Sequence, residues 1–335
     1  MADLSVRGGS PFAAGRLRRL ELWAVFAAAS FATLGAAAAL FVGGGEVLAA
    51  LGRIDALTLL LLLALSLANY GFRVLRWHRL ALRLAVAAPI AKTLLYYVAG
   101  FAMTATPGRV GEALRLWLIK RSQGHRYDRM LPLFLADRLF DSLSVLLLGL
   151  VGIAAFPQQR WIAILAVLVL MVVTASLARP GWLLQSLLWL FGAVGPRFAR
   201  PLAGLRRSVR GTAAILKAAP LADALVLSII GWGAECIAFS LLLDAMGAPI
   251  GLAAACFVFA FSAAVGAATL LPGGLGGTEA TMVALLSSLG VDLGTGLAAT
   301  LVIRATTLWF GVALGFLALP FALRIASGPA TEAPA

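Results

Sequence analysis

The sequence predicts an all-α polytopic membrane protein, with about six full transmembrane helices and two re-entrant helical hairpins arranged as an inverted repeat. Three observations predict it. Hydrophobic residues make up 62% of the 335-residue chain and charged residues only 12%, which is more apolar surface than a soluble domain can bury. Apolar runs of spanning length recur along the chain and are too long for barrel strands. Two similar Pro-Gly motifs interrupt shorter apolar segments at matching places in the two halves.

The long apolar runs predict the membrane-spanning helices. The first run is long enough to span and lacks an Ala-x-Ala-like exit, so we interpret it as a span and not as a cleavable signal. The predicted spans are 22–43, 56–72, 130–156, 161–178, 221–245 and 295–320.

The positions of Lys and Arg predict that both termini lie in the cytoplasm. The formal net charge is +13, and most of the 27 basic residues fall into alternating groups. The loops on the opposite side hold only Arg53 and Arg160. The positive-inside rule therefore gives a multi-pass protein of the cytoplasmic (inner) membrane with its basic groups inside. Nucleic acid is excluded as a partner, because no soluble basic domain would carry it.

This charge pattern also divides the chain into segments. The connector between the two halves has seven Lys or Arg residues and is interpreted as cytoplasmic and interfacial. The predicted divisions are a cytoplasmic basic segment at 1–20, a single membrane domain at 21–322 with halves at about 56–178 and 221–320, the connector at 179–219, and a short disordered cytoplasmic tail at 323–335.

Two pairs of short apolar segments predict the hairpins. Basic groups flank the pair at 90–119, so both its ends lie on the cytoplasmic face. Its second arm, of about 12 residues, would be only ~18 Å long against a ~30 Å hydrocarbon core. The pair at 252–290 follows an outward span and precedes an inward one, so its ends face outside. Its first arm, 252–271, could also span, and the rest of the topology would be unchanged.

Each hairpin has a Pro-Gly turn at its tip, then a glutamate, and later an arginine. The first copy runs from Pro107 to Glu112 and its proline lies 31 residues before Arg138, whereas Pro272 lies 32 residues before Arg304. Glycine permits the sharp reversal and close backbone approach that a tip needs. The predicted tip residues are Pro107, Gly108, Gly111, Pro272, Gly273, Gly274 and Gly276.

A small set of ionisable residues lies inside apolar helices. An ion at a helix centre costs at least ~2.5–3.5 kcal/mol, so each needs a partner or a watery cavity. The half-helix that returns from each tip points its amino terminus toward the bilayer interior, where free N–H groups and nearby arginines would bind an anion such as a lipid phosphate. The predicted head-group site contains Arg109, Glu112, Arg115, Asp137, Arg138, Asp141, Glu279 and Arg304.

Structural salt bridges are the alternative interpretation of these residues. Arg138 would pair with Asp141 or Glu112, and Arg304 with Glu279, and each pair would lock a hairpin to a helix. Because matched Glu and Arg recur in both halves, we favour the binding site for the set as a whole.

Other polar residues receive simpler interpretations. Glu235 and Asp244 also lie within apolar runs but have no assigned role. Cys236 and Cys256 lie in apolar segments, and no His/Cys cluster is present in the sequence, so neither a metal nor a cofactor is expected. Basic and aromatic residues after the second span are interpreted as an interfacial anchor, with head-group contact as the alternative; they are Arg73, Arg76, Trp77 and Arg79.

The motifs together are similar to those of the lysylphosphatidylglycerol synthase/flippase membrane-domain family. The resemblance rests on the run from Tyr97 to Arg121, the DRLFD sequence at 137–141, the LPGGLGGTE sequence at 271–279, and Arg304, and it covers roughly residues 20 to 322. It implies a membrane region that moves phospholipid between leaflets. The family's aminoacyl transfer belongs to a separate cytosolic domain, so synthase activity is not expected of this chain.

The sequence therefore predicts a lipid flippase or transporter rather than an enzyme. A head group would enter a polar cavity between the hairpins, and movement would be gradient-driven or downhill, because no nucleotide-binding motif is visible. Two alternatives stay open: a non-catalytic partner of a lipid-modifying enzyme, and a membrane-embedded transferase acting on a lipid-linked substrate. Membrane lipids are the expected partners, and a homo-oligomer is compatible with the sequence.

Overall fold

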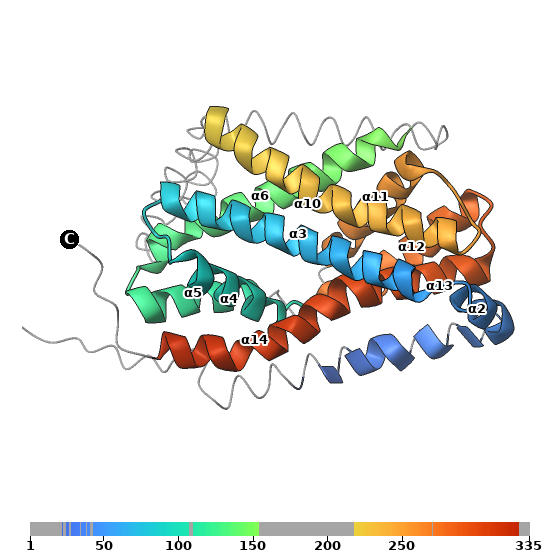
Figure 1. Ribbon diagram of the computed structural model, residues 1–335, viewed down its shortest axis with the longest axis horizontal. Helices are drawn as coiled ribbons and strands as arrows, with labels where there is room; N and C mark the ends of the chain where they lie inside the picture. The colour runs from blue at the N-terminus through green and yellow to red at the C-terminus, as the bar shows by residue number, and fades with distance from the viewer. Residues whose placement is uncertain are drawn as a thin grey trace, which may run out of the picture.

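A computed structural model describes residues 43–106, 110–153, 218–269 and 271–327, together with parts of 22–40. Every element of regular secondary structure within these residues is helical, which confirms the all-α prediction (Figure 1). The elements are α2 (Gly44–Leu51), α3 (Ala56–Arg83), α4 (Ile90–Phe101), α5 (Val110–Gln123), α6 (Tyr127–Val151), α10 (Ala218–Ala245), α11 (Leu252–Ala268), η5 (Pro272–Gly274), α12 (Gly277–Ser288), α13 (Leu293–Arg304), η6 (Ala305–Trp309) and α14 (Phe310–Ala326).

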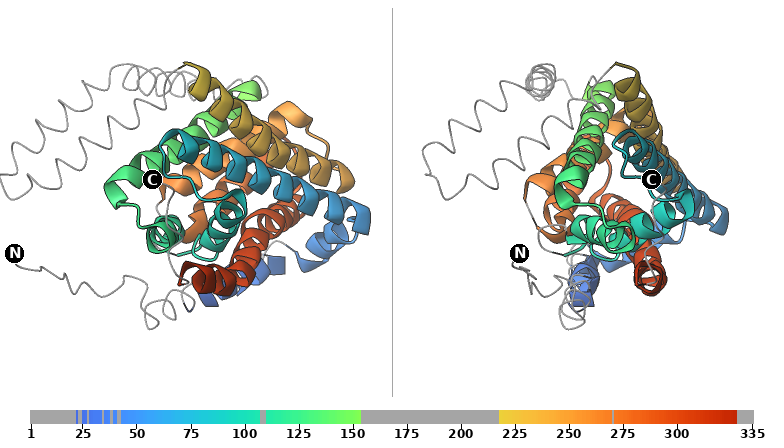
Figure 2. Two further views of the ribbon diagram at one scale, coloured as in Figure 1. Left: turned by 60° about the vertical axis from the view of Figure 1, so that its left-hand side comes forward. Right: turned by 90° about the vertical axis from the view of Figure 1, so that its left-hand side faces the viewer.

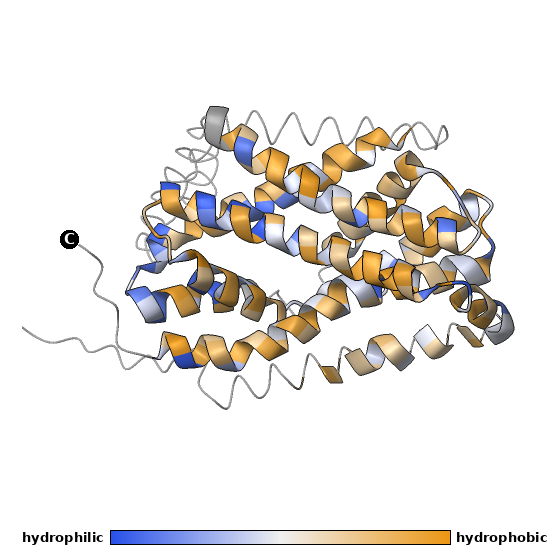
Figure 3. Cartoon of the chain, in the orientation of Figure 1, coloured by the Kyte–Doolittle hydropathy of each residue, from blue (hydrophilic) through white to orange (hydrophobic). Residues whose placement is uncertain are grey.

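Three of the described helices are long and apolar enough to cross a membrane. They are Ala56–Arg83, Leu221–Ala245 and Leu293–Ala326, with 28, 25 and 34 residues. At ~1.5 Å per residue each exceeds the ~30 Å hydrocarbon core. Large apolar side chains are exposed on the outer faces of these helices, among them Leu60 and Phe321, and apolar residues predominate along the bundle (Figure 3). The chain is a multi-pass membrane protein.

The two halves of the chain meet along α3 and α10, which lie side by side for much of their length (Figure 1). Asp55 begins α3 by accepting a hydrogen bond from the N–H of Thr58 at 2.8 Å, which satisfies one of the free donors at the helix start. At Gly231 of α10 the two helices are in direct contact: a Cβ there would lie at van der Waals distance, 3.5 Å, from the backbone oxygen of Asn69. Viewed along the long axis, α3 and α10 lie on the side opposite α11 and α12 (Figure 2).

Both predicted hairpins are present as pairs of packed short helices. The helix α4 packs against α5, and α11 packs against α12. These four helices have 12, 14, 17 and 12 residues, so at ~1.5 Å per residue none reaches across a ~30 Å core.

The first arm of each hairpin packs against the helix that follows the other hairpin in the sequence. Thus α4 contacts α14, and α11 contacts α6. Both contacts use glycine for close approach. A Cβ on Gly315 of α14 would lie 2.1 Å from the backbone nitrogen of Ala102, and one on Gly152, directly after α6, would lie 1.8 Å from the backbone oxygen of Ala253. The two halves are therefore interlocked through these two contacts.

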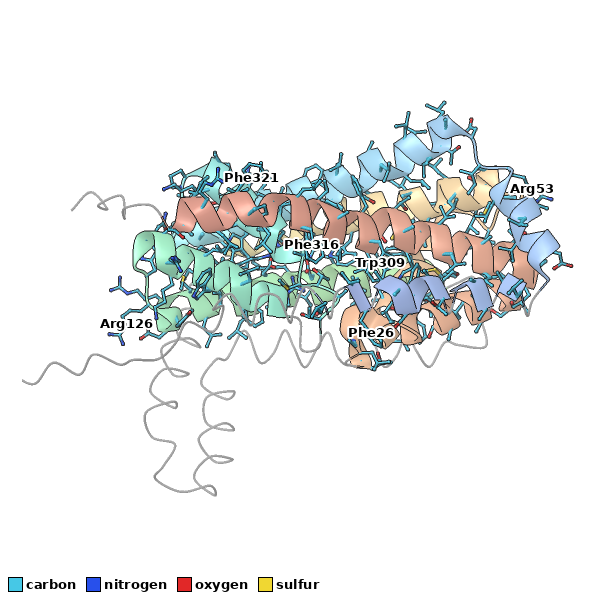
Figure 4. The ribbon with its side chains drawn as sticks, turned by 90° about the horizontal axis from the view of Figure 1, so that it is seen from below. Phe26, Arg53, Arg126, Trp309, Phe316 and Phe321 are labelled. Carbon is cyan, nitrogen blue, oxygen red and sulfur yellow. The ribbon has the colours of Figure 1, made fainter. Side chains whose placement is uncertain are left out.

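The last span is a single long helix with a π-helical turn, η6, between α13 and α14. A π-helical turn shifts the regular hydrogen bonding and is frequent at functional sites. Here the hydroxyl of Tyr70 donates to the carbonyl of Thr307 within this turn. The described residues of the first span pack on the same turn, with the rings of Phe31 and Trp309 5.3 Å apart; Trp309 is labelled in Figure 4.

Several boundaries differ from those predicted. Helix α3 continues to Arg83 instead of ending at 72, and two basic residues of this extension, Arg73 and Arg76, lie inside the bundle. Helix α14 continues to Ala326, past the predicted domain end at 322. The short helix α2 is not among the predicted elements. The predicted span at 161–178, the segment 1–20, the end of the tail and nearly all of the connector lie outside the described residues.

Candidate functional site

An arginine–aspartate cluster lies inside the bundle, where α3, α5 and α6 approach one another. Its two carboxylates are one turn apart on α6, and its guanidinium groups come from all three helices. The guanidinium groups and carboxylates form ion pairs in which the N–O distances are 4.0 Å or less. The cluster consists of Arg73, Arg76, Arg115, Asp137, Arg138 and Asp141.

The innermost member is Arg76, whose side chain has an exposed fraction of 0%. Its guanidinium group donates to the carboxylates of Asp137 and Asp141, the latter at 2.8 Å, and to the hydroxyl of Ser228 on α10. One side chain of α3 therefore connects α6 and α10. A buried, multiply bonded guanidinium of this kind fixes the relative positions of the helices that it joins.

The outer members are Arg73 and Arg138. Arg73 lies 2.8 Å from Asp141, and Arg138 lies 2.9 Å from Asp137 and 2.8 Å from Asp141. Trp232 of α10 completes this side: its indole N–H donates to Asp141 at 3.1 Å, and the guanidinium of Arg73 lies 5.3 Å from its ring centroid. A cation near an indole ring is stabilised further when water is excluded.

Arg115 joins the cluster from the first hairpin. Its Nε donates to the carbonyl of Tyr97 at 3.2 Å, and its guanidinium lies 3.6 Å from the centroid of the Tyr97 ring. A second nitrogen lies 4.0 Å from Asp137. The stacking holds a charged group of α5 against the cluster while leaving its Nη1 without a hydrogen-bond partner among the described residues.

The cluster carries more positive than negative charge. Among the side chains that the structure describes, four guanidinium groups and two carboxylates leave two positive charges. All six side chains are buried or largely buried, so solvent cannot screen this excess well. An excess of cations in an apolar bundle favours the binding of an anion.

A cavity of about 530 Å³ adjoins the cluster. Its wall includes Arg73, Arg115, Arg138 and Asp141 from the first half of the chain. From the second half come Glu235, Arg304 and apolar residues of α11. Arg76 and Asp137 lie behind this wall and do not line the cavity. The cavity therefore joins the two halves, with charged groups on one part of its wall and apolar side chains on the rest.

The tip of the second hairpin is held by one ion pair. Arg304 donates to Glu279 at 2.6 Å and to the carbonyl of Gly273 at 2.6 Å. The other carboxylate oxygen of Glu279 accepts the N–H of Gly276 at 2.7 Å. Gly273 and Gly276 have φ values of 62° and 83°, in the left-handed region that glycine adopts without strain. The Pro-Gly motif of the second tip is thus stabilised by the side chain of its own glutamate, Glu279.

The tip of the second hairpin lies next to the segment that follows α4. A Cβ on Gly273 would lie 3.8 Å from the Cα of Ala105, which follows α4. Ala105 and Val312 form a small buried cluster, and Leu275 of the second tip packs against it. The short helices of the two hairpins therefore meet inside the bundle, beside the cavity.

Comparison with known proteins identifies the family. Residues 22–315 match the lysylphosphatidylglycerol synthase TM region. The chain belongs to this family. It is also similar to a UPF0104 membrane protein of Methanothermobacter thermautotrophicus, with 27% identity over 311 residues, 85% of this chain and 91% of that protein. A UPF0104 membrane protein of Pyrococcus horikoshii is 25% identical over 244 residues, 65% of this chain and 73% of that one.

Family membership agrees with the resemblance predicted from the sequence, and the structure places most of the predicted site residues. Arg115, Asp137, Arg138 and Asp141 lie together in the cluster. Arg304 and Glu279, like Arg138 and Asp141, form ion pairs that the alternative interpretation as structural salt bridges predicted. Five of the remaining predicted residues belong to the first tip: Pro107, Gly108 and Arg109 lie outside the described residues, and for Gly111 and Glu112 only the helical backbone is described.

One interpretation of this family member's sequence is wrong. Arg73, Arg76 and Trp77 are not an interfacial anchor, because α3 carries them into the core, where the two arginines bind the aspartates of α6. Arg79, in contrast, is 45% exposed and pairs with Asp223 of α10. Asp244 is exposed at the end of α10 and is not a buried intramembrane acid.

Sequence reasoning also missed the polar face of α3 as part of the site. Ser66, Asn69, Tyr70 and Arg73 follow one another at intervals of three, one and three residues, the spacing of a single helix face. Asn69, Tyr70 and Arg73 line the cavity. A polar stripe within an otherwise apolar span is the signal that would have revealed them.

Proposed function

We propose that this protein moves a polar, anionic lipid between the leaflets of the membrane. The observation that carries the proposal is the cluster with two excess positive charges in the wall of a cavity shared by both halves. A lipid phosphate would bind the guanidinium groups of Arg73, Arg138 and Arg115, and bidentate binding would suit both the planar guanidinium and the phosphate oxygens. The acyl chains would stay against the apolar helices.

The topology of the proposed transporter is an inverted repeat in the inner membrane with both termini in the cytoplasm. Two features support it. The interlocked packing of α4 on α14 and of α11 on α6 pairs equivalent elements of the two halves. Arg53 and Arg126, predicted for opposite sides of the membrane, lie at opposite ends of the molecule (Figure 4). Binding sites of such transporters lie between the repeats near the midplane.

Purified protein in liposomes tests this function. Tail-labelled phosphatidylglycerol would be the anionic probe and tail-labelled phosphatidylcholine the zwitterionic one, and a membrane-impermeant quencher would report movement between leaflets. We expect faster movement of the anionic probe. Loss of one buried, hydrogen-bonded charge costs ~2–5 kcal/mol, so Arg73→Gln and Arg138→Gln should each slow it more than about tenfold.

Arg79→Gln is the matched control, because Arg79 is an arginine of the same helix α3 that pairs outside the cavity. It should transport as the wild type does. Equal rates of lipid movement for the Arg73, Arg138 and Arg79 variants would show that the cluster is not part of the lipid-binding site. A wild-type protein that moves no lipid alone, but copurifies with a lipid-modifying enzyme, would instead favour a partner role.

A further inference from the structure

Glu235 is a buried acid that the proposed lipid site does not use. It lies within α10, has an exposed fraction of 3%, and lines the cavity. Ser66 of α3 donates to its Oε2 at 3.3 Å. In the part of the chain that the structure describes, no arginine, lysine or histidine forms an ion pair with it.

The groups around Glu235 come from every helix that packs on α10. Next to it on its own helix, Cys236 contacts Cys256 of α11. The titratable and charged groups that share the cavity wall with Glu235 are Tyr70 and Arg73 on α3, Arg115 on α5, Arg138 and Asp141 on α6, and Arg304 on α13.

Two opposing effects decide the charge of Glu235. Burial without a counter-ion disfavours the carboxylate by several kcal/mol, whereas the excess positive charge of the cluster favours it. The nearest cation, Arg73, already pairs with Asp141 at 2.8 Å, and Arg304 already pairs with Glu279 at 2.6 Å. Because Arg73 and Arg304 each have another carboxylate as partner, their attraction for Glu235 is weakened, and burial favours the neutral acid in this cavity.

An anionic head group would strengthen this preference. A phosphate bound at Arg73 and Arg138 would place a negative charge in the cavity that Glu235 also lines, and like charges in a poorly solvated space repel strongly. By reciprocity, the proton on Glu235 must strengthen binding of the anion as much as the anion strengthens binding of the proton.

We infer that Glu235 is a proton-binding site of the lipid cavity, occupied whenever an anionic head group is loaded; this inference rests on the proposed lipid transport. The proton comes from water on the loading side, binds one carboxylate oxygen of Glu235, and leaves to water on the other side. One phosphate anion and one proton together carry no net charge. The pair can therefore cross the apolar bundle without the cost of moving an ion.

The test compares lipid movement with and without a pH gradient in liposomes containing tail-labelled phosphatidylglycerol. We expect acid on the loading side to speed wild-type movement by about fivefold or more, and an ionophore that collapses the gradient to remove the difference. Glu235→Gln, which resembles the protonated acid, should move lipid at a rate that does not depend on the pH gradient. Asp244→Asn removes an exposed carboxylate of the same helix and should respond as the wild type does.

The possible results separate the two proposals. If the rate of wild-type lipid movement does not depend on the pH gradient, or if the Glu235→Gln variant depends on it as strongly as the wild type, the proton site is refuted. The proposed lipid transport is not refuted by either result. No lipid movement by the wild type in either condition overturns both. Infrared spectroscopy gives a direct second readout: at neutral pH the wild type should show a carboxylic-acid C=O band that Glu235→Gln lacks, and spectra without this difference would contradict the inference even if the variant were unstable.

Discussion

Removing Asp137 should destabilise the protein more than removing the arginine that it binds most directly. Asp137 accepts from Arg76 and Arg138 and lies 4.0 Å from Arg115, so Asp137→Asn would raise the excess charge of the cluster from two to three. Arg76→Met would lower it from two to one. Both changes break buried ion pairs, but only the first leaves additional uncompensated cations.

The magnitude follows from the distances. At 2.9 Å, the Arg138–Asp137 separation, an ion pair is worth roughly 6 kcal/mol at an effective dielectric constant of ~20, before desolvation is subtracted. Breaking a buried pair by removing one partner costs ~3–5 kcal/mol in practice. We expect Asp137→Asn near the upper end of that range. Arg76→Met should lie near the lower end, because Asp137 keeps Arg138.

A double-mutant cycle tests this reasoning by measuring the interaction energy between Asp137 and Arg76. The variant carrying both changes restores an excess of two charges, so its loss of unfolding free energy should be smaller than the sum of the single losses by at least about 2 kcal/mol. Unfolding free energies would be measured by steric trapping in lipid bilayers. Losses that add within about 0.5 kcal/mol would refute a shared cluster, as would an Arg76 variant less stable than the Asp137 variant.

Two further predictions concern packing and helix ends. Gly315→Ala should destabilise the protein by about 1–3 kcal/mol, because its Cβ would lie 2.1 Å from the backbone nitrogen of Ala102; Gly233→Ala, with nothing within 4 Å of its Cβ, is the control and should be neutral or stabilising in the same assay. Asp292 begins α13, and hydrogen bonding from Thr295 lowers the pKa of its carboxyl below the ordinary value. This stabilisation is present above the unfolded-state pKa of about 4 and is lost as pH falls through the lower folded-state pKa, so Asp292→Ala should cost about 1 kcal/mol near neutral pH and little in strong acid. If the stability difference between Asp292→Ala and the wild type were the same in strong acid as near neutral pH, the capping role of Asp292 would be contradicted.

The sequence predicted the elements of this fold whose signals are local. Runs of apolar residues gave the three long helices that can cross a membrane, and the Pro-Gly motif with its glutamate gave the second pair of short helices; the alternative interpretation gave the ion pair with Arg304. Asp137 and Asp141 are four residues apart, the spacing of one helix face, and both bind the arginines of one cluster.

The part of the site that the sequence did not predict depends on where α3 ends and on which helices pack beside it. Basic residues after an apolar run usually mark the membrane interface, so Arg73 and Arg76 were assigned there. Their burial requires two carboxylates on α6 and a hydroxyl on α10, partners far away in sequence. Charge compensation of this kind is visible only once the helices are packed.

The interlocked hairpins have a consequence for biosynthesis. The first hairpin leaves the ribosome early, yet α14, against which α4 packs through Gly315 and Ala102, is among the last elements made. At ~5–20 residues per second, the interval between them is on the order of tens of seconds. During this time the short first hairpin must wait in the bilayer without its partner, so the insertion machinery or the basic residues that flank the hairpin must keep it from leaving the membrane.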